Sequence, residues 1–143
     1  MAEVRRATLE DVPACADIVD AWVEASDWLP RAHSREDFAE MIALSLPDRE
    51  FWVAGTPVAG YLSFNPEARQ IMGFYTARPG SGVGKLLLDH VKRGRDYIQL
   101  WTHVPNTAAH RFYAREGFVE VERDPVGSGQ GVAELRMEWR RDA

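Results

Sequence analysis

Residues 78–91 read RPGSGVGKLLLDHV, a glycine cluster followed at once by apolar residues at helical spacing. The run 70–76 before the cluster is rich in β-forming residues, and the spacing after it predicts a helix that starts at Gly82 and stops at Gly94. One face of this helix carries Val83, Leu86, Leu87, His90 and Val91. Backbone N–H groups at such a helix start can hold phosphate oxygens, but glycine also serves an ordinary tight turn, so both interpretations stay open here.

Two common phosphate-binding motifs do not match this stretch. A P-loop needs glycine at position 79 and Ser or Thr after the lysine, where the chain has Pro79 and Leu86. A dinucleotide-binding fingerprint needs its third glycine at position 85, which is Lys85, and it normally belongs to the first βαβ unit of a chain. The sequence therefore argues against both a P-loop NTPase and a Rossmann dinucleotide site.

A second motif follows 24 residues after Gly82. Residues 106–118 read NTAAHRFYAREGF, after the β-rich run 97–104. Asn106 is a preferred helix cap, and Gly117 ends the helix before a further β-rich run at 118–121. The predicted helix carries Ala109, Phe112 and Tyr113. Strand, helix and strand therefore alternate across this half of the chain.

The remaining segments complete a mixed α/β order. Thr8 and Ser34 precede two apolar-periodic runs as caps, which predicts helices starting near Leu9 and after Ser34, the second ending before Pro47. Further strands are expected at 4–7, 51–54, 58–64 and 133–139, with the turn Gly55-Thr56-Pro57 joining the second and third of these. The predicted order is β-α-α-β-β-β-α-β-α-β-β, with no internal repeat, so we expect one domain over residues 1–143.

Composition narrows the function class. The chain has 143 residues, 45% hydrophobic and 27% charged, which is typical of a globular protein. Its single cysteine, Cys15, excludes an intramolecular disulfide, and no Cys/His cluster has zinc-ligand spacing. The net charge of −5 and the lack of an aromatic-interleaved basic stripe argue against nucleic acid as a partner. No long apolar run or secretory signal is evident. We therefore expect no association with a membrane, and we expect a cytoplasmic location.

Charge is uneven along the chain. Residues 1–55 carry a formal charge of −7 and residues 56–143 one of +2, and segment 78–115 holds seven basic residues against two acidic ones. A basic segment around a glycine-rich helix start favours a small anionic ligand.

The two motifs together resemble the Gcn5-related N-acetyltransferases (GNAT). The resemblance is specific over about residues 68–122 and, through the predicted element order, extends loosely to the whole chain. It implies a central mixed sheet of six to seven strands flanked by about four helices and splayed at the cofactor strand. It also implies transfer of an acetyl group from acetyl-CoA to a primary amine by direct attack in a ternary complex, with no metal.

The resemblance further implies which residues bind the cofactor. Pantetheine would pair with the strand residues Phe74, Tyr75 and Thr76, and the pyrophosphate would lie on the backbone of Gly80, Ser81, Gly82, Val83, Gly84 and Lys85. Asn106 either contacts pantetheine or serves only as a cap. The arginine or glutamine usual in the first motif falls at Pro79, so Arg78 or Lys85 would have to supply that contact.

Acetyl transfer also needs a proton for the departing thiolate and a base for the amine. By resemblance Tyr113 is the acid, although a helical tyrosine can equally be core. Candidate bases are Glu67, His103, Asp27 and His33.

Acceptor recognition is expected from the first two helices, where Trp22, Asp27, Trp28 and His33 cluster and offer aromatic faces and a carboxylate to a cationic amine. The alternative for this region is an apolar lid with a solvated acidic face. The loop Gly127–Gly131 is either a substrate lip or a simple hairpin loop. The acceptor is expected to be a small-molecule or peptide amine, and a homodimer stays open, as does a non-catalytic acyl-CoA-binding or regulatory module.

Overall fold

The computed structural model describes residues 3–127 and 131–141, and its elements follow the predicted order. The strands are β1 (Val4–Arg6), β2 (Glu50–Ala54), β3 (Gly60–Asn65), β4 (Gln70–Thr76), β5 (Tyr97–His103), β6 (Val119–Asp124) and β7 (Glu134–Arg140). The helices are α1 (Val12–Ala25), α2 (Arg35–Ser45), α3 (Val83–Lys92) and α4 (Thr107–Arg115), with short 3₁₀ turns at Leu9–Asp11 and Leu46–Asp48. The predicted fold class, a mixed sheet with four flanking helices, is confirmed.

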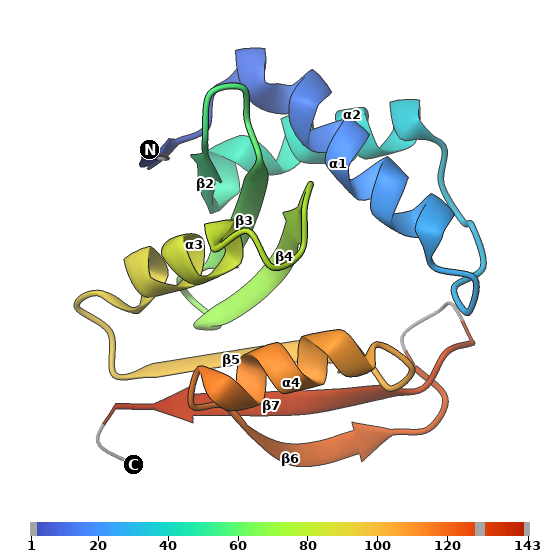
Figure 1. The fold of residues 1–143 in the computed structure, drawn as a ribbon, viewed down its shortest axis with the longest axis vertical. Coiled ribbons are helices and arrows are strands. Elements are labelled where there is room, and N and C mark those ends of the chain that lie inside the picture. Colours follow the sequence, from blue (N-terminus) through green and yellow to red (C-terminus); the bar gives the residue numbers. More distant parts are fainter. Residues whose placement is uncertain (1–2, 128–130, 142–143) are drawn as a thin grey trace.

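All seven strands form one sheet in the order β1-β2-β3-β4-β5-β7-β6. Every neighbouring pair is antiparallel except β4 and β5, which are parallel and meet at only two residue pairs, Gln70–Gln99 and Ile71–Leu100. Beyond Ile71 the two strands diverge, and Figure 1 shows the sheet opening into two halves there. The splay that the resemblance implied is therefore present in the middle of the sheet.

Helices cover both faces of the sheet. On one face α1 and α2 pack on β2 and β3, where Val19, Val53 and Tyr61 belong to one buried cluster. On the other face, Leu87 of α3 and Tyr113 of α4 belong to a second cluster that spans both halves. Fully burying such apolar side chains stabilises the fold by about 1.5–3 kcal/mol each, so the second cluster holds the halves together although few β4–β5 bonds join them.

The first helix begins later than the sequence predicts. A 3₁₀ turn occupies Leu9–Asp11, and α1 starts only at Val12 with Pro13 in its first turn. The carboxylate of Asp11 accepts hydrogen bonds from the backbone N–H of Thr8 at 2.8 Å and from the Arg5 guanidinium at 2.7 Å. Asp11 is buried, and these hydrogen bonds satisfy its charge and join β1 to the helix start.

Two strand boundaries also differ from prediction. The third strand begins at Gly60 instead of residue 58, and the sixth extends to Asp124 because β7 pairs with it along its length. Over the described residues 3–127 and 131–141, none of the helices combines the length and apolarity needed to cross a membrane. Within the same residues no group of three or more His, Cys, Asp or Glu side chains is arranged to hold a metal ion.

Candidate active site

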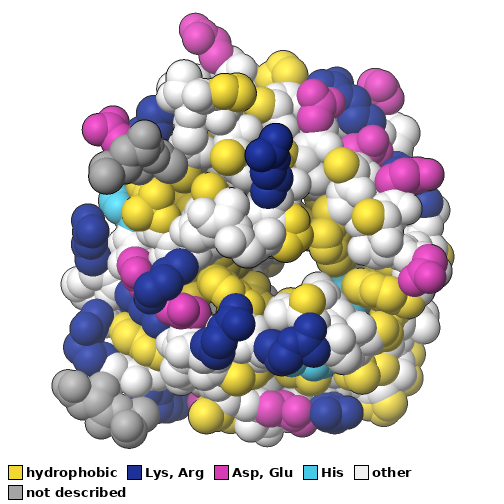
Figure 2. Space-filling model, viewed as in Figure 1, with side chains coloured by type: hydrophobic (Ala, Val, Ile, Leu, Met, Phe, Trp, Pro, Cys, Tyr) yellow, Lys and Arg dark blue, Asp and Glu magenta, His cyan; other side chains and the backbone are white. Residues whose placement is uncertain are grey.

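The splay between β4 and β5 opens into a cavity of about 400 Å³. Its walls come from β4, from the end of β5 and from α4, and Trp22 of α1 closes one side. Figure 2 shows the molecule hollowed between its two halves, with hydrophobic side chains at the hollow and basic ones around it. The cavity therefore lies where the edges of β4 and β5 are not bonded to each other.

The glycine turn lies at the start of α3. Gly82 caps this helix with φ +88°, and Gly80 has φ +82°, both in the left-handed region that glycine tolerates. No heavy atom lies within 4 Å of the position that a Cβ would take at either residue. The backbone N–H groups of the first turn, including Val83 and Gly84, lack partners within the helix. An open helix N-terminus of this kind suits a phosphate group.

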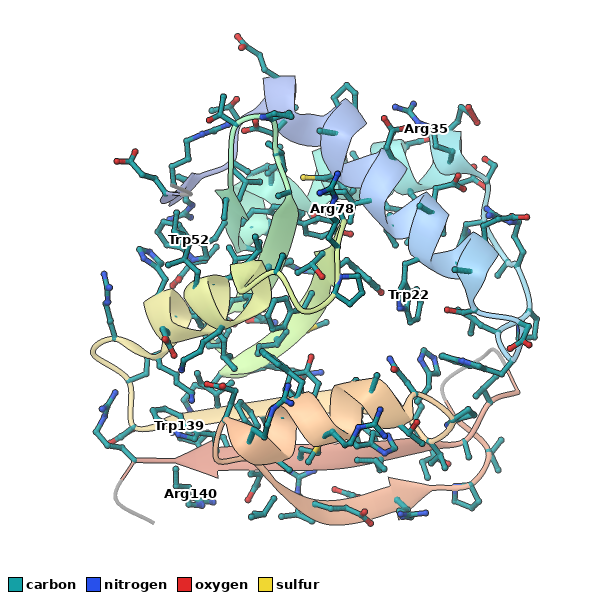
Figure 3. The ribbon with its side chains drawn as sticks, in the orientation of Figure 1. Trp22, Arg35, Trp52, Arg78, Trp139 and Arg140 are labelled. Carbon is teal, nitrogen blue, oxygen red and sulfur yellow. The ribbon has the colours of Figure 1, made fainter. Side chains whose placement is uncertain are left out.

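Lys85 and Arg78 are the two cations that could replace the side-chain contact missing at Pro79, and they differ in their ion pairs. The Lys85 ammonium lies 3.1 Å from the Glu116 carboxylate and 3.3 Å from that of Asp89, and these contacts raise its pKa. Arg78 lies where β4 leads into the turn (Figure 3) and forms no ion pair with any residue that the structure describes. Arg78 is therefore the cation that is available to a ligand at this turn.

Tyr113 belongs to the core and also reaches the cavity. Its side chain is 8% exposed and packs against the rings of Phe74, Phe112 and Phe118, with centroid distances of 5.5–6.3 Å. It is also one of the residues that line the cavity. Burial, with a smaller contribution from Tyr75, raises the pKa of Tyr113 well above the ordinary value of a tyrosine. Its hydroxyl is therefore a proton donor throughout the neutral range.

The side chains of Phe74, Tyr75 and Thr76, the strand residues implicated by resemblance, contact different elements. The Phe74 ring faces Phe112 on the α4 side, whereas the Tyr75 ring lies 5.0 Å from Trp22 on the α1 side. Both residues line the cavity. Thr76 lies outside it, with its methyl group beside Gly60 and Gly84 at the start of α3.

Asn106 is a helix cap in the structure. Its side-chain oxygen accepts a hydrogen bond from the Ala109 N–H at 3.3 Å. The residue also lines the cavity, so its amide NH₂ group remains available for the predicted pantetheine contact.

Of the four candidate bases, His103 alone lines the cavity. Glu67 lies in the exposed β3–β4 turn, and Asp27 is exposed in the α1–α2 loop. The His33 ring packs against Phe38, 5.8 Å away, outside the cavity.

The predicted acceptor cluster is only partly assembled. The rings of Trp22 and Trp28 contact each other at 5.8 Å and both contact His103, at 6.4 and 5.2 Å. Figure 3 shows Trp22 extending from α1 towards the opening. Asp27 and His33 do not join this group. Most of the loop Gly127–Gly131 lies outside the described residues, so its predicted role is not tested.

Trp101, Asp124 and Glu134 are among the cavity-wall residues that sequence analysis did not predict. Trp101 comes from β5, and Asp124 and Glu134 come from the two strands that flank the loop at 125–133. For Asp124 and Glu134 the missed signal was register, because the antiparallel pairing of β6 with β7 places these two residues opposite each other.

Comparisons with known proteins agree with this geometry. The model of the acetyltransferase (GNAT) domain family matches residues 47–120, just over half of the chain. A peptidyl-lysine N-acetyltransferase, YjaB of Salmonella typhimurium, is 28% identical over 131 residues, which cover 88% of this chain and 89% of that protein.

Solved structures resemble the fold over nearly the whole chain. Apo YjaB from Escherichia coli has a TM-score of 0.79 at 22% identity, covering 97% of each chain. YncA of Salmonella typhimurium, a putative acetyltransferase solved with its cofactor acetyl-CoA, has a TM-score of 0.71 at 22% identity, covering 100% of this chain and 95% of that one. With the family model matching the segment that contains the glycine turn and Tyr113, this chain belongs to the GNAT family of acetyltransferases.

Proposed function

We propose that this protein, acting as a single domain, transfers the acetyl group of acetyl-CoA to a primary amine by direct attack within a ternary complex. The observation that carries the proposal is the parting of β4 and β5 beside the open N-terminus of α3, with Tyr113 on the wall of the crevice. The structure of YncA with acetyl-CoA supports the choice of cofactor, because that protein shares the fold.

The residues of the crevice fit the parts of acetyl-CoA. Past Ile71 the edge of β4 that faces β5 has no strand partner, so its backbone groups can bond the pantetheine amides as a neighbouring strand would. The open turn at Gly80 and Gly82 and the start of α3 offer N–H groups to the pyrophosphate, and Arg78 adds a positive charge. This arrangement binds an extended, partly anionic ligand along the crevice.

A bulge in β4 lies where the strands separate. Phe64 pairs with Ile71 and Ser63 with Gly73, so Met72 is an extra residue in β4. A bulge re-aims backbone groups next to it. We assign to the backbone N–H groups of the following segment, near Phe74 and Tyr75, the stabilisation of the negative charge that develops on the acetyl oxygen.

Bound acetyl-CoA supplies an activated acetyl thioester, and Tyr113 completes the chemistry at the sulfur. The Tyr113 hydroxyl donates a proton to the departing thiolate. Because burial keeps the pKa of this tyrosine high, its proton is present at every pH at which the protein would work.

The first acceptor to test is a lysine side chain in a peptide. This choice rests on the Salmonella relative, a peptidyl-lysine N-acetyltransferase that aligns over 88% of the chain. A lysine ε-amine meets the chemical requirement, since it is a primary amine on an unbranched chain.

Calorimetry with acetyl-CoA tests the cofactor site directly, with CoA and ATP as controls. We expect acetyl-CoA and CoA to bind in the micromolar range and ATP to bind far more weakly. A thiol-release assay then measures whether a lysine peptide accelerates formation of free CoA. Absence of acetyl-CoA binding contradicts the proposal, and binding without amine-dependent thiol release would indicate the non-catalytic acyl-CoA-binding module.

A further inference from the structure

Three side chains form a row across the sheet on the side of the cavity where Trp22 of α1 meets His103. We call this side the acceptor side. Asp124 of β6 pairs in register with Glu134 of β7, and Glu134 pairs with His103 of β5. Directly opposite residues on neighbouring strands project from the same face of a sheet. All three residues line the cavity, so we call them the acceptor row.

Two tryptophans lie beside His103, and one of them, Trp22, lines the cavity. The rings of Trp22 and Trp28 contact His103, and Trp22 also contacts Tyr75. The loop that carries Trp28 is attached to α1 by Arg31, whose guanidinium lies 2.8 Å from Asp20 and 3.0 Å from Glu24. Both tryptophans are therefore held beside His103 before any acceptor arrives.

The acceptor side is acidic. Among the described residues that line the cavity there are two carboxylates, Asp124 and Glu134, and neither lysine nor arginine. The nearest cation on the same face of β7, Arg136, is held by Glu122 at 2.6 Å and by Glu138 at 2.7 Å. The cavity therefore attracts a cation at this side and repels a carboxylate.

We propose, resting on the function proposed above, that the acceptor row receives the amine as an alkylammonium ion and that His103 removes its proton. The acceptors selected are unbranched alkylamines without a carboxylate near the amine. Such a cation is attracted by Glu134 and Asp124 and packs against the face of Trp22. Free amino acids, with a carboxylate beside their amine, are poor acceptors.

The proton balance follows from these positions. An N–H bond of the ammonium breaks and its proton passes to a ring nitrogen of His103. The neutral nitrogen attacks the thioester carbon, a C–N bond forms, the C–S bond breaks and its electron pair goes to sulfur, which takes the proton of Tyr113. The nitrogen loses its second proton through solvent to the tyrosinate, and His103 releases its proton to solvent. The products are the acetamide, the CoA thiol and one proton.

The charged and titratable groups around His103 favour this role. Glu134 faces it from β7, Asp124 lies one strand further along the row on β6, and Tyr75 lines the cavity from β4. His110 of α4 approaches His103 at the backbone, with its Nε2 atom 2.9 Å from the His103 carbonyl oxygen. Glu134, directly opposite on the next strand, gives His103 a carboxylate neighbour on the same face of the sheet.

The base is tested by pH profiles of His103→Gln, with His33→Gln as the matched control outside the cavity. We expect kcat with pentylamine to fall about 100-fold in His103→Gln and to stay at the wild-type level in His33→Gln. Wild-type kcat should level off at a lower pH than kcat of the variant, which should continue to rise towards the amine pKa of about 10. Added imidazole should restore part of the activity of His103→Ala. Full activity with an unchanged profile in His103→Gln overturns the proposal.

The charge of the row is tested with three acceptors that share an alkyl chain: pentane-1,5-diamine, pentylamine and 2-aminohexanoate, which is pentylamine with a carboxylate on the carbon that bears the amine. We expect the wild type to prefer the first two over the last by about tenfold or more in kcat/KM, as a charge interaction of about 1.4 kcal/mol would give. In Glu134→Gln and Asp124→Asn the preference should shrink through the KM for the amine, with the KM for acetyl-CoA unchanged. Glu40→Gln, an exposed carboxylate on α2, is the control. An unchanged preference in both variants overturns the charge selection.

Binding without turnover provides an independent measurement. In NMR titrations of the protein alone, pentylamine should shift the His103 ring signals and hexanoate should not, and Glu134→Gln should weaken the pentylamine effect. A matching series of peptides, with arginine or glutamate beside the lysine, distinguishes a basic peptide from a small amine as the source of the cation. If acetyl-CoA fails to bind in calorimetry, the proposed function fails. If acetyl-CoA binds but pentylamine leaves His103 unperturbed, only the acceptor row fails.

Discussion

Tyr113 joins two roles in one side chain. Its ring fills the core among Phe74, Phe112 and Phe118, and its residue lines the crevice. Replacement by phenylalanine keeps the ring packing and removes only the hydroxyl, so a loss of activity can be assigned to the proton.

For Tyr113→Phe we expect kcat to fall about 10- to 100-fold while the Kd for acetyl-CoA stays constant, because the departing thiolate must then take its proton from water. The thiol-release assay across pH and calorimetry measure the two quantities. Tyr97→Phe, which removes a hydroxyl that bonds Glu138 away from the cavity, serves as the control. If Tyr113→Phe turns over at the wild-type rate at all pH values, the group that protonates the thiolate is not Tyr113.

Cys15 provides a second prediction for a single residue. Its side chain is fully buried, and burial raises the pKa of its thiol to about 12, so almost no thiolate forms in the native protein. A disulfide reagent such as DTNB should leave the native protein unlabelled over minutes and label one thiol in 8 M urea. Fast stoichiometric labelling of the native protein would contradict the packing of α1 on the sheet.

At the scale of one element, the start of α3 requires glycine at one position and only accommodates it at another. Gly82 has φ +88°, so a Cβ strains the backbone there although the space is open. Gly84 lies inside the helix, where a Cβ would meet the Phe112 ring at 3.5 Å, an ordinary contact.

We therefore expect Gly82→Ala to lower the free energy of unfolding by about 1–2 kcal/mol and Gly84→Ala to leave it unchanged or raise it by up to about 1 kcal/mol. Urea denaturation of the two variants measures both changes. The opposite order would mean that α3 does not begin at Gly82.

At the scale of the whole molecule, ionised carboxylates join elements far apart in the sequence. Bonding to Arg5 lowers the pKa of Asp11, and bonding to Tyr97 and Arg136 lowers the pKa of Glu138. In the unfolded chain both carboxyls regain ordinary pKa values of about 4, so the unfolded state binds more protons as the pH falls.

The free energy of unfolding should consequently fall as the pH drops through 4 towards the lowered carboxyl values, after a smaller decline below about pH 6.5 from His90, whose pKa is lowered by burial. Urea denaturation between pH 7 and pH 3 measures this slope. Asp11→Asn should reduce the slope and cost about 1 kcal/mol at pH 7, since half of Arg5 is exposed to solvent. Glu40→Gln should behave as the wild type, and a flat profile down to pH 3 would exclude the linkage.

Prediction from sequence succeeded where the signal is local. The 3.6-residue period and the flanking glycines located α3, and the Asn106 cap and Gly117 located α4, because caps and helical spacing involve residues a few positions apart. The predicted helix start near Leu9 coincides with the 3₁₀ turn, and the α-helix itself begins three residues later, at Val12.

The sequence by itself determined the order of the elements, the family and the position of the glycine turn, since each depends on neighbouring residues. Only the tertiary structure decided how far β4 and β5 part, that Lys85 is already paired with Glu116, and that His103 lies in one row with Glu134 and Asp124. These relations join strands and helices separated by about 20 residues or more. They are set by sheet order and by packing of the whole chain, which no local pattern encodes.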